Sequence, residues 1–125
     1  MLQKILFIED EEALRRALGD VLSQSGYEML TASNGEAGVE VAKKQSPDLI
    51  LLDLVLPKKS GFEVLQELKE DPTTKNIPII VLTNLEGSED IERALVSGAT
   101  TYLVKANYSA HDVALKIKQV LDRSS

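Results

Sequence analysis

The chain has 125 residues, with 43% hydrophobic residues, 27% charged residues and a formal net charge of −6. This length predicts one domain with one hydrophobic core, and the absence of cysteine excludes disulfides, thiolate metal sites and a cysteine nucleophile. The acidic balance argues against nucleic acid or an anionic membrane as a direct partner, because phosphate binding needs a basic surface. The N-terminus is unlike a signal peptide, and no apolar run reaches the ~20 residues of a membrane span. We therefore expect a cytoplasmic protein.

Short apolar runs alternate with amphipathic segments along the chain, and each run predicts a strand. The first, third and fourth runs are almost continuously apolar, as expected for strands buried on both faces. The second run is weaker and flanked by polar residues, which is typical of an edge strand. The five predicted strands are Lys4–Ile8, Glu28–Ala32, Asp48–Asp53, Ile77–Thr83 and Thr100–Val104.

Apolar residues with helical spacing follow each strand and predict five helices. The five stripes are Leu14, Ala17, Leu18, Val21 and Leu22; Ala37, Val41 and Ala42; Phe62, Leu65 and Leu68; Ile91, Ala94, Leu95 and Gly98; and Val113, Ile117, Val120 and Leu121. Three capping-box patterns predict where helices start, namely Ser33 with Glu36, Ser60 with Glu63, and Ser109 with Asp112.

The strict (βα)5 alternation predicts an α/β fold with a doubly wound, five-stranded parallel sheet and helices on both faces. Right-handed crossovers leave few topologies, and we expect the strand order 2-1-3-4-5 of a flavodoxin-like three-layer sandwich. No linker or low-complexity segment divides the chain, so residues 1–125 are expected to form a single domain. In such sheets the functional site lies outside the carboxyl ends of the strands, between strands 1 and 3.

Three acidic residues come at the ends of two of these runs, namely Glu9 and Asp10 after the first and Asp53 after the third. If strands 1 and 3 are neighbours, the three carboxylates converge at one edge of the sheet. At an effective dielectric of about 20, two charges about 4 Å apart repel by roughly 4 kcal/mol, so the cluster implies a cation. Oxygen ligands alone favour a hard cation such as Mg²⁺. Thr83 and Lys105 follow strands 4 and 5 and are expected on the same rim.

The residues of this rim suit phosphoryl transfer to a carboxylate. Asp53 could attack a phosphoryl group and become an acyl phosphate, while Lys105 and the Thr83 hydroxyl stabilise the phosphoryl oxygens. Taken one at a time, each residue also has an ordinary structural explanation, as a helix cap, a strand-end threonine or a surface lysine. Their joint placement on one rim favours the functional interpretation.

The segments ILFIEDEEALRR, LILLDLVLPKKSGFEVL, IIVLTN and YLVK resemble the receiver domain of two-component response regulators, and the resemblance covers essentially the whole chain. It implies that Asp53 accepts a phosphoryl group from a phosphohistidine on a sensor histidine kinase or a phosphotransfer protein. It also implies that Lys105 binds the phosphoryl group, that Thr83 supplies a switch hydroxyl and that Tyr102 is the aromatic residue that changes rotamer on activation.

The same resemblance implies a Mg²⁺ cofactor. Asp10 and Asp53 would be direct ligands, Glu9 would act through water, and the backbone carbonyl of Val55 would be a further ligand. A receiver of this kind would be a signalling phosphoacceptor that catalyses only its own phosphorylation and dephosphorylation. It would act on a downstream protein through the face formed by helix 4, strand 5 and helix 5, as a monomer or a weak phosphorylation-dependent dimer. We expect no output domain within these 125 residues, and a piece of a longer protein is the alternative that the sequence leaves open.

Several positions depart from the family pattern. Ala106 stands where proline usually follows the lysine, often after a cis peptide bond, so either the site holds a costly cis bond or the loop differs. Leu56 stands where the family commonly has methionine. Asn84 stands where the family commonly has a small residue, and its larger side chain is expected to narrow access to the phosphoryl group. Val55 and Leu85 are apolar at positions that flank the path of the hydrolytic water, so we hypothesise a long-lived phosphorylated form.

Three other interpretations remain open. A phosphorylation-independent interaction module of the same fold is favoured by Ala106 but opposed by the intact site residues. A metal-dependent phosphohydrolase would be expected to have a second acidic residue two positions after Asp53, where this chain has Val55. A flavin-binding protein would need residues that donate hydrogen bonds to a phosphate after strand 1, where this chain has the acidic segment EDEE. His111 is expected at the surface, and Val96 with its neighbours Tyr102 and Tyr108 would suit a partner interface if exposed.

Overall fold

The structure is a computed structural model that describes residues 2–124. Across these residues five strands alternate with five α-helices, and a short 3₁₀ helix follows the last strand. The elements are β1 (Lys4–Ile8), α1 (Glu12–Gln24), β2 (Glu28–Ala32), α2 (Gly35–Gln45), β3 (Leu49–Leu52), α3 (Gly61–Glu70), β4 (Ile79–Thr83), α4 (Ser88–Val96), β5 (Thr101–Val104), η1 (Lys105–Asn107) and α5 (Ala110–Ser124).

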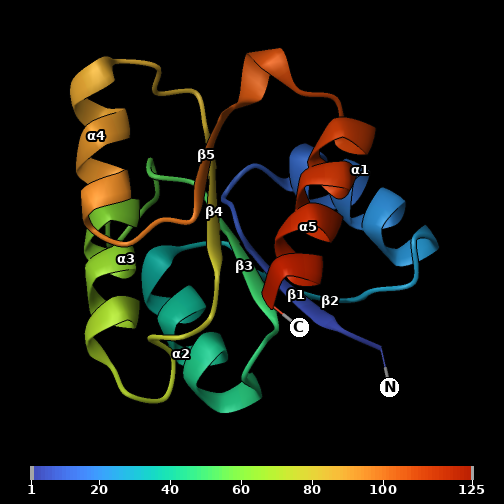
Figure 1. Cartoon of the computed structure of the whole chain (residues 1–125), viewed down its shortest axis with the longest axis horizontal. Coiled ribbons are helices and arrows are strands. Elements are labelled where there is room, and N and C mark those ends of the chain that lie inside the picture. Colours follow the sequence, from blue (N-terminus) through green and yellow to red (C-terminus); the bar gives the residue numbers. More distant parts are fainter. Residues whose placement is uncertain (1, 125) are drawn as a thin grey trace.

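The strands form one parallel sheet in the order β2-β1-β3-β4-β5, which confirms the predicted topology. Helices α1 and α5 cover one face of the sheet, and α2, α3 and α4 cover the other (Figure 1). Strand β1 lies next to β3, with Ile8 opposite Leu52, so the chain segments that follow these two strands begin side by side.

Two apolar layers hold the sheet between the helices. Every residue of β3 and β4 is buried, as continuous apolar runs predict for strands covered on both faces. Strand β2 is only partly buried and occupies an edge of the sheet, as expected. Burying one large aliphatic side chain contributes about 1.5–3 kcal/mol, so these central strands fix the sheet firmly. None of the helices formed by residues 2–124 combines the length and the apolar character needed to cross a bilayer.

Three strands begin later than predicted, because polar residues and a proline precede them. Strand β3 starts at Leu49, and the preceding Asp48 pairs with Lys4 of β1 through its side chain, whose carboxylate accepts from the Lys4 amide. Strand β4 starts at Ile79, because Pro78 has no amide hydrogen to donate to a ladder. Strand β5 starts at Thr101, one residue after the predicted Thr100.

One of the three predicted helix caps was wrong. Asn34, not Ser33, caps α2 by accepting a hydrogen bond from the Ala37 amide. The two other caps are confirmed: Ser60 accepts from the Glu63 amide, and Ser109 and Asp112 form a reciprocal capping box. Asn and Ser cap helices about equally well, so their order alone could not decide the position at α2.

The predicted apolar stripe of α4 was also wrong in part. Ala94 is buried, but Leu95 is 45% exposed and Gly98 lies beyond the end of the helix at Val96. Leu95 lies about 100° round the helix from Ala94, so it points away from the sheet that Ala94 contacts. The stripe of α5 is confirmed, since Val113, Ile117, Val120 and Leu121 are all buried.

Gly61 is required by the close approach of α3 to the end of β3. A Cβ atom at Gly61 would lie 2.3 Å from the Asp53 carbonyl oxygen and 2.3 Å from the Leu54 Cα, both of which are backbone atoms. At Gly19, inside α1, a Cβ atom would meet nothing within 4 Å. The first glycine is therefore fixed by sterics and the second is not.

We predict that Gly61→Ala destabilises the protein by roughly 1–3 kcal/mol or more, because the backbone that carries Asp53 has to move. Gly19→Ala is the matched control and should stabilise the protein by about 1 kcal/mol through helix propensity. Urea unfolding of both variants measures the difference, and equal stabilities would contradict this account of Gly61.

Candidate functional site

The carboxyl ends of β1 and β3 bring the three acidic residues together. The Asp53 amide donates to the Ile8 carbonyl over 3.1 Å, which fixes Asp53 beside the start of the loop after β1. Ligand oxygens of Glu9, Asp10 and Asp53 all lie within 4.8 Å of one another. Glu9 and Asp53 are buried and Asp10 is exposed, so the cluster has a closed inner side and an open outer side.

These carboxylates lie in an open cleft of about 520 Å³ at the carboxyl edge of the sheet. The residues that line it are Glu9, Asp10, Glu11, Asp53, Val55, Asn84 and Lys105. Val55 is 58% exposed at the rim, and its amide donates to Asp53 Oδ1 over 3.2 Å. The Val55 side chain thus faces solvent while its backbone is held against the acidic residue.

Lys105 links the edge of the sheet to its centre. From the end of β5 its Nζ donates to Asp53 Oδ2 over 2.9 Å and lies 2.6 Å from Glu9 Oε1. Its side chain is 13% exposed. Burial alone would lower the pKa of Lys105, but its close contacts with Glu9 and Asp53 and their negative charge outweigh burial and raise the pKa. Lys105 is therefore held as a cation between two carboxylates.

Glu9 is the least well solvated of the three acids. Its side chain is 1% exposed, and Oε1 contacts Lys105 as an ion pair without the angles of a hydrogen bond. Oε2 accepts from the Glu11 amide over 3.2 Å. Burial raises the pKa of Glu9 to about 7, and the nearby Asp53 carboxylate acts in the same direction, while Lys105 and the Glu11 amide oppose it. A buried carboxylate beside two other carboxylates is a position that a cation stabilises, as the Lys105 ammonium does here.

The two predicted switch residues lie behind the cleft and meet at Leu85. Thr83 is fully buried at the end of β4, and its Oγ1 accepts a long hydrogen bond of 3.5 Å from the Leu85 amide. The Tyr102 hydroxyl on β5 donates to the Leu85 carbonyl over 2.7 Å. Burial raises the pKa of Tyr102, with smaller contributions from Asp90 and Asp53. Both hydroxyls therefore contact one residue of the loop between β4 and α4.

The segment that contains Ala106 is a short helix built from trans peptide bonds. Residues Lys105–Asn107 form the 3₁₀ helix η1, and no peptide bond between residues 2 and 124 is cis. Of the two alternatives that Ala106 raised, the altered loop is the one observed. Lys105 nevertheless reaches both Glu9 and Asp53.

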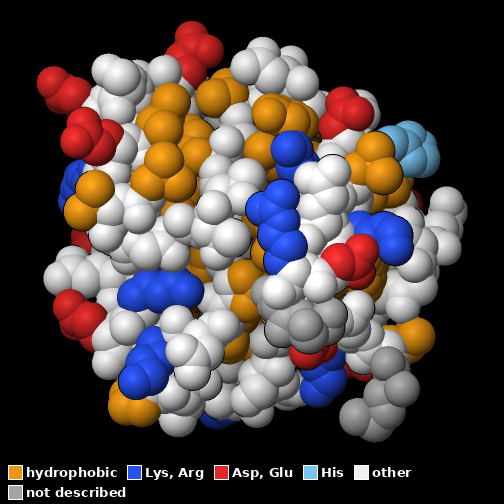
Figure 2. Space-filling view, in the orientation of Figure 1, with side chains coloured by type: hydrophobic (Ala, Val, Ile, Leu, Met, Phe, Trp, Pro, Cys, Tyr) orange, Lys and Arg blue, Asp and Glu red, His pale blue; other side chains and the backbone are white. Residues whose placement is uncertain are grey.

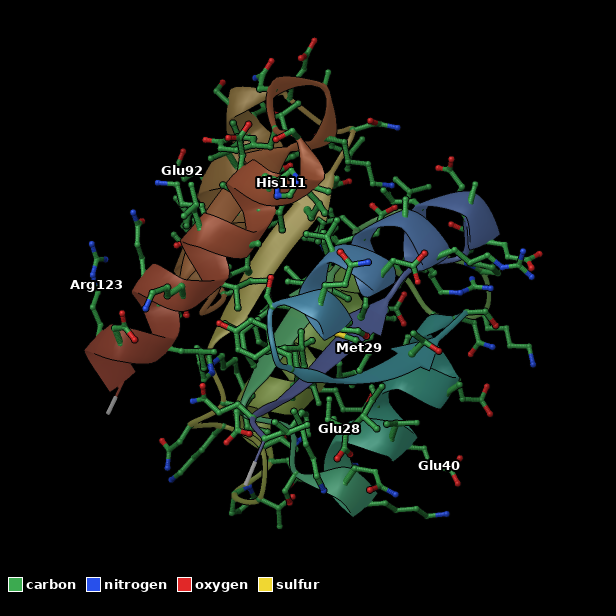
Figure 3. All side chains as sticks on the ribbon, turned by 90° about the vertical axis from the view of Figure 1, so that its right-hand side faces the viewer. Glu28, Met29, Glu40, Glu92, His111 and Arg123 are labelled. Carbon is green, nitrogen blue, oxygen red and sulfur yellow. The ribbon has the colours of Figure 1, made fainter. Side chains whose placement is uncertain are left out.

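Arg15 contributes to the site in a way that the sequence did not indicate. Its Nη1 donates to the Glu9 backbone carbonyl over 2.6 Å from the second turn of α1. No motif marks this contact, because one arginine in an amphipathic helix is usually at the surface. His111 lies on the exposed side of α5 near its amino-terminal end, as expected (Figure 3).

The donor set suits Mg²⁺. Three carboxylates within reach of one point offer only oxygen ligands, which is the chemistry that a small hard cation prefers. Exposed Asp10 leaves the outer side open for water or a phosphoryl group. The buried inner side holds Asp53 and Glu9 in place through Lys105 and backbone amides.

Comparisons with known proteins agree with this geometry. The family profile of the response regulator receiver domain matches residues 5–117. The chain is 39% identical over 121 residues to the probable transcriptional regulator ycf27 of Porphyridium aerugineum, covering 97% of this chain and 49% of that protein. The chain thus spans about half the length of that curated relative.

Two solved structures have the same fold over nearly all of the chain. A CheY-like receiver domain protein from Methanospirillum hungatei JF-1 gives a TM-score of 0.93 at 27% identity, covering 99% of this chain and 97% of that one. The receiver domain of sensor histidine kinase PA1611 from Pseudomonas aeruginosa PAO1 gives 0.83 at 28% identity, covering 98% and 97%. The latter was solved with a magnesium ion coordinated in its active site cleft.

The raised pKa of Glu9 predicts a pH-dependent stability. A carboxyl whose pKa is higher in the folded state contributes stability below its unfolded value, here 4.5, and loses it as pH rises through about 7. In EDTA, we expect the wild type to lose more stability between pH 5.5 and pH 8 than Glu9→Gln does, and the variant to be the more stable at pH 8. Urea unfolding at both pH values tests this, and parallel pH profiles would contradict it.

Proposed function

The chain belongs to the response regulator receiver domain family, and we propose that it is a phosphorylation-controlled switch whose phosphoacceptor is Asp53. The observation that carries the proposal is the placement of the Asp53 carboxylate, with Lys105 on one oxygen and two further carboxylates within 4.8 Å. The phosphodonor would be a phosphohistidine of a sensor histidine kinase or phosphotransfer protein, which implies a cytoplasmic location. Residues 1–125 would form a single receiver domain.

In the proposed reaction an Asp53 oxygen forms a bond to phosphorus as the bond from phosphorus to the donor histidine nitrogen breaks. Asp53 Oδ1 is held by the Val55 amide and Oδ2 by Lys105, so the nucleophile is oriented before the donor arrives. The Lys105 ammonium would then move its hydrogen bond from Asp53 Oδ2 to an oxygen of the transferred phosphoryl group. The Thr83 hydroxyl, at the same edge of the sheet, would donate to another.

We assign the cofactor as Mg²⁺, which would neutralise the phosphoryl oxygens during transfer. Asp10 and Asp53 would bind it directly, Glu9 through water, and Val55 through its backbone carbonyl. Support comes from the all-oxygen cluster and from the magnesium in the receiver domain of PA1611.

The proposed switch runs from Asp53 to the loop between β4 and α4. If Thr83 turns to a phosphoryl oxygen, its hydrogen bond from the Leu85 amide is lost, and the Tyr102 contact on the Leu85 carbonyl is released with it. Helix α4 buries only Ala94, so it can shift at small cost.

The output surface would be the face made by α4, β5 and α5. Val96 is 82% exposed and Leu95 45%, and Figure 2 shows hydrophobic side chains on the part of this face that α4 forms. A surface of this kind suits a downstream protein or a weak phosphorylation-dependent dimer. The domain would not act on a separate substrate.

The proposal is tested by intact mass after incubation with acetyl phosphate and Mg²⁺. We expect one phosphoryl adduct on the wild type, none on Asp53→Ala and none in EDTA. Asp48→Ala, on an acidic residue at the opposite end of β3, is the matched control and should be phosphorylated normally. An unmodified wild type that still binds Mg²⁺ would favour a phosphorylation-independent interaction module, with Ala106 the first position to restore to proline.

A second prediction concerns how long the phosphoryl group persists. The exposed Val55 and the half-buried Leu85 have no side-chain group that could orient a hydrolytic water. A single added hydrogen bond of about 1 kcal/mol corresponds to roughly fivefold in rate, so Val55→Asn should shorten the lifetime by about that factor. Val55→Leu is the apolar control. Rapid Mg²⁺-dependent loss of phosphate that Val55→Asn leaves unchanged would contradict the hypothesis.

A further inference from the structure

We propose that Arg15 is a positioning residue for the metal-binding loop, because its guanidinium fixes the backbone next to Asp10. The proposal rests on the proposed function in one respect, namely that this loop holds Mg²⁺. Arg15 touches none of the reacting groups. It would act through the peptide between Glu9 and Asp10.

The hydrogen bond from Arg15 to Glu9 holds the loop at the residue where the chain leaves β1. The Glu9 amide donates to the Ala32 carbonyl on β2 over 2.9 Å, so the amide side of this residue continues the sheet. On the carbonyl side the chain leaves the sheet, and the Glu9 oxygen accepts from Arg15 Nη1 over 2.6 Å. A charged donor at this distance is among the stronger hydrogen bonds in proteins. Asp10 is attached directly to that carbonyl.

Helix α1 lacks the usual means of fixing the start of a helix. Its N-cap residue, Glu11, makes no side-chain capping hydrogen bond, whereas Asn34 and Ser60 cap α2 and α3. The Glu11 amide is instead used by Glu9 Oε2 over 3.2 Å. At α1 the hydrogen bond from Arg15 to the Glu9 carbonyl links the helix to the preceding loop, as the side-chain caps do at α2 and α3.

The direction in which Mg²⁺ affinity changes when Arg15 is replaced distinguishes a positioning role from a purely electrostatic one. A guanidinium this close to a cation site repels the cation, so an arginine that acted only by its charge would weaken Mg²⁺ binding. Its removal would then tighten binding. If Arg15 instead holds Asp10 in place, its removal weakens binding although a positive charge has been lost.

Arg16 offers a matched control on the same helix. It pairs with Glu12 over 2.8 Å at the surface, with a side chain that is 78% exposed. Arg15→Met and Arg16→Met each remove one positive charge from neighbouring positions of α1 and keep an unbranched side chain. Only the first removes the hydrogen bond to Glu9.

Isothermal titration of each folded variant with MgCl₂ tests the proposal. We expect Arg15→Met to weaken Mg²⁺ binding by about tenfold, as for other residues that orient metal ligands, and Arg16→Met to change it by less than about twofold. Hydrogen exchange of the metal-free proteins should be faster over residues 9–12 in Arg15→Met only. If Arg15→Met does not fold, Arg15→Gln, whose side chain is too short to span the contact, takes its place with the same expectation.

The outcomes distinguish this inference from the function on which it rests. Mg²⁺ binding that Arg15→Met leaves unchanged or tightens overturns the positioning role and leaves the proposed function intact. A wild type that does not bind Mg²⁺ at all overturns the metal requirement, and the inference with it. Weaker binding in both variants would show a general effect of charge or stability and would also overturn it.

Discussion

The contact of one lysine with two buried carboxylates is the constraint on which the site depends. Lys105 lies 2.6 Å from Glu9 and 2.9 Å from Asp53, with little exposure to solvent. Without it, the ends of β1 and β3 would present like charges to one another inside the protein. Because Lys105 follows the edge strand β5, the same contact ties that edge to the centre of the sheet. The charge balance of the acidic cluster and the position of β5 are therefore set together.

The fold was predictable because its signals are repeated and long. Five apolar runs separated by amphipathic segments allow few arrangements, and the continuously apolar runs β3 and β4 are fully buried while the weaker run β2 lies at an edge. The predictions that failed concern single residues, namely the cap of α2 and the buried face of α4. Ser33 and Asn34 are equivalent caps in sequence, and the residue pattern alone does not show that Asn34 is the one that accepts from the Ala37 amide. Leu95 fits a helical stripe, but the rotation of α4 about its axis turns Ala94 inward and leaves Leu95 exposed.

The site was predictable in its residues but not in its contacts. Parallel strands carry Glu9, Asp53 and Lys105 to one edge as a matter of topology, so their positions in sequence were sufficient. That Thr83 and Tyr102 both contact Leu85 depends on the loop after β4, which has no sequence signal. The hydrogen bond from Arg15 to the Glu9 backbone carbonyl could not be predicted from the sequence, because every residue has a backbone carbonyl and none is marked as an acceptor by its residue type.

The sparse packing of α4 has a consequence for how a signal would be read. With Ala94 as its one buried side chain, α4 has fewer buried residues than α1, α2 or α3, so we expect its displacement to cost little free energy. We therefore expect this helix to sample other positions before any chemistry occurs. A modification at Asp53 would then redistribute an existing ensemble, and a partner that binds α4 would, by reciprocity, favour the modified state of the distant aspartate.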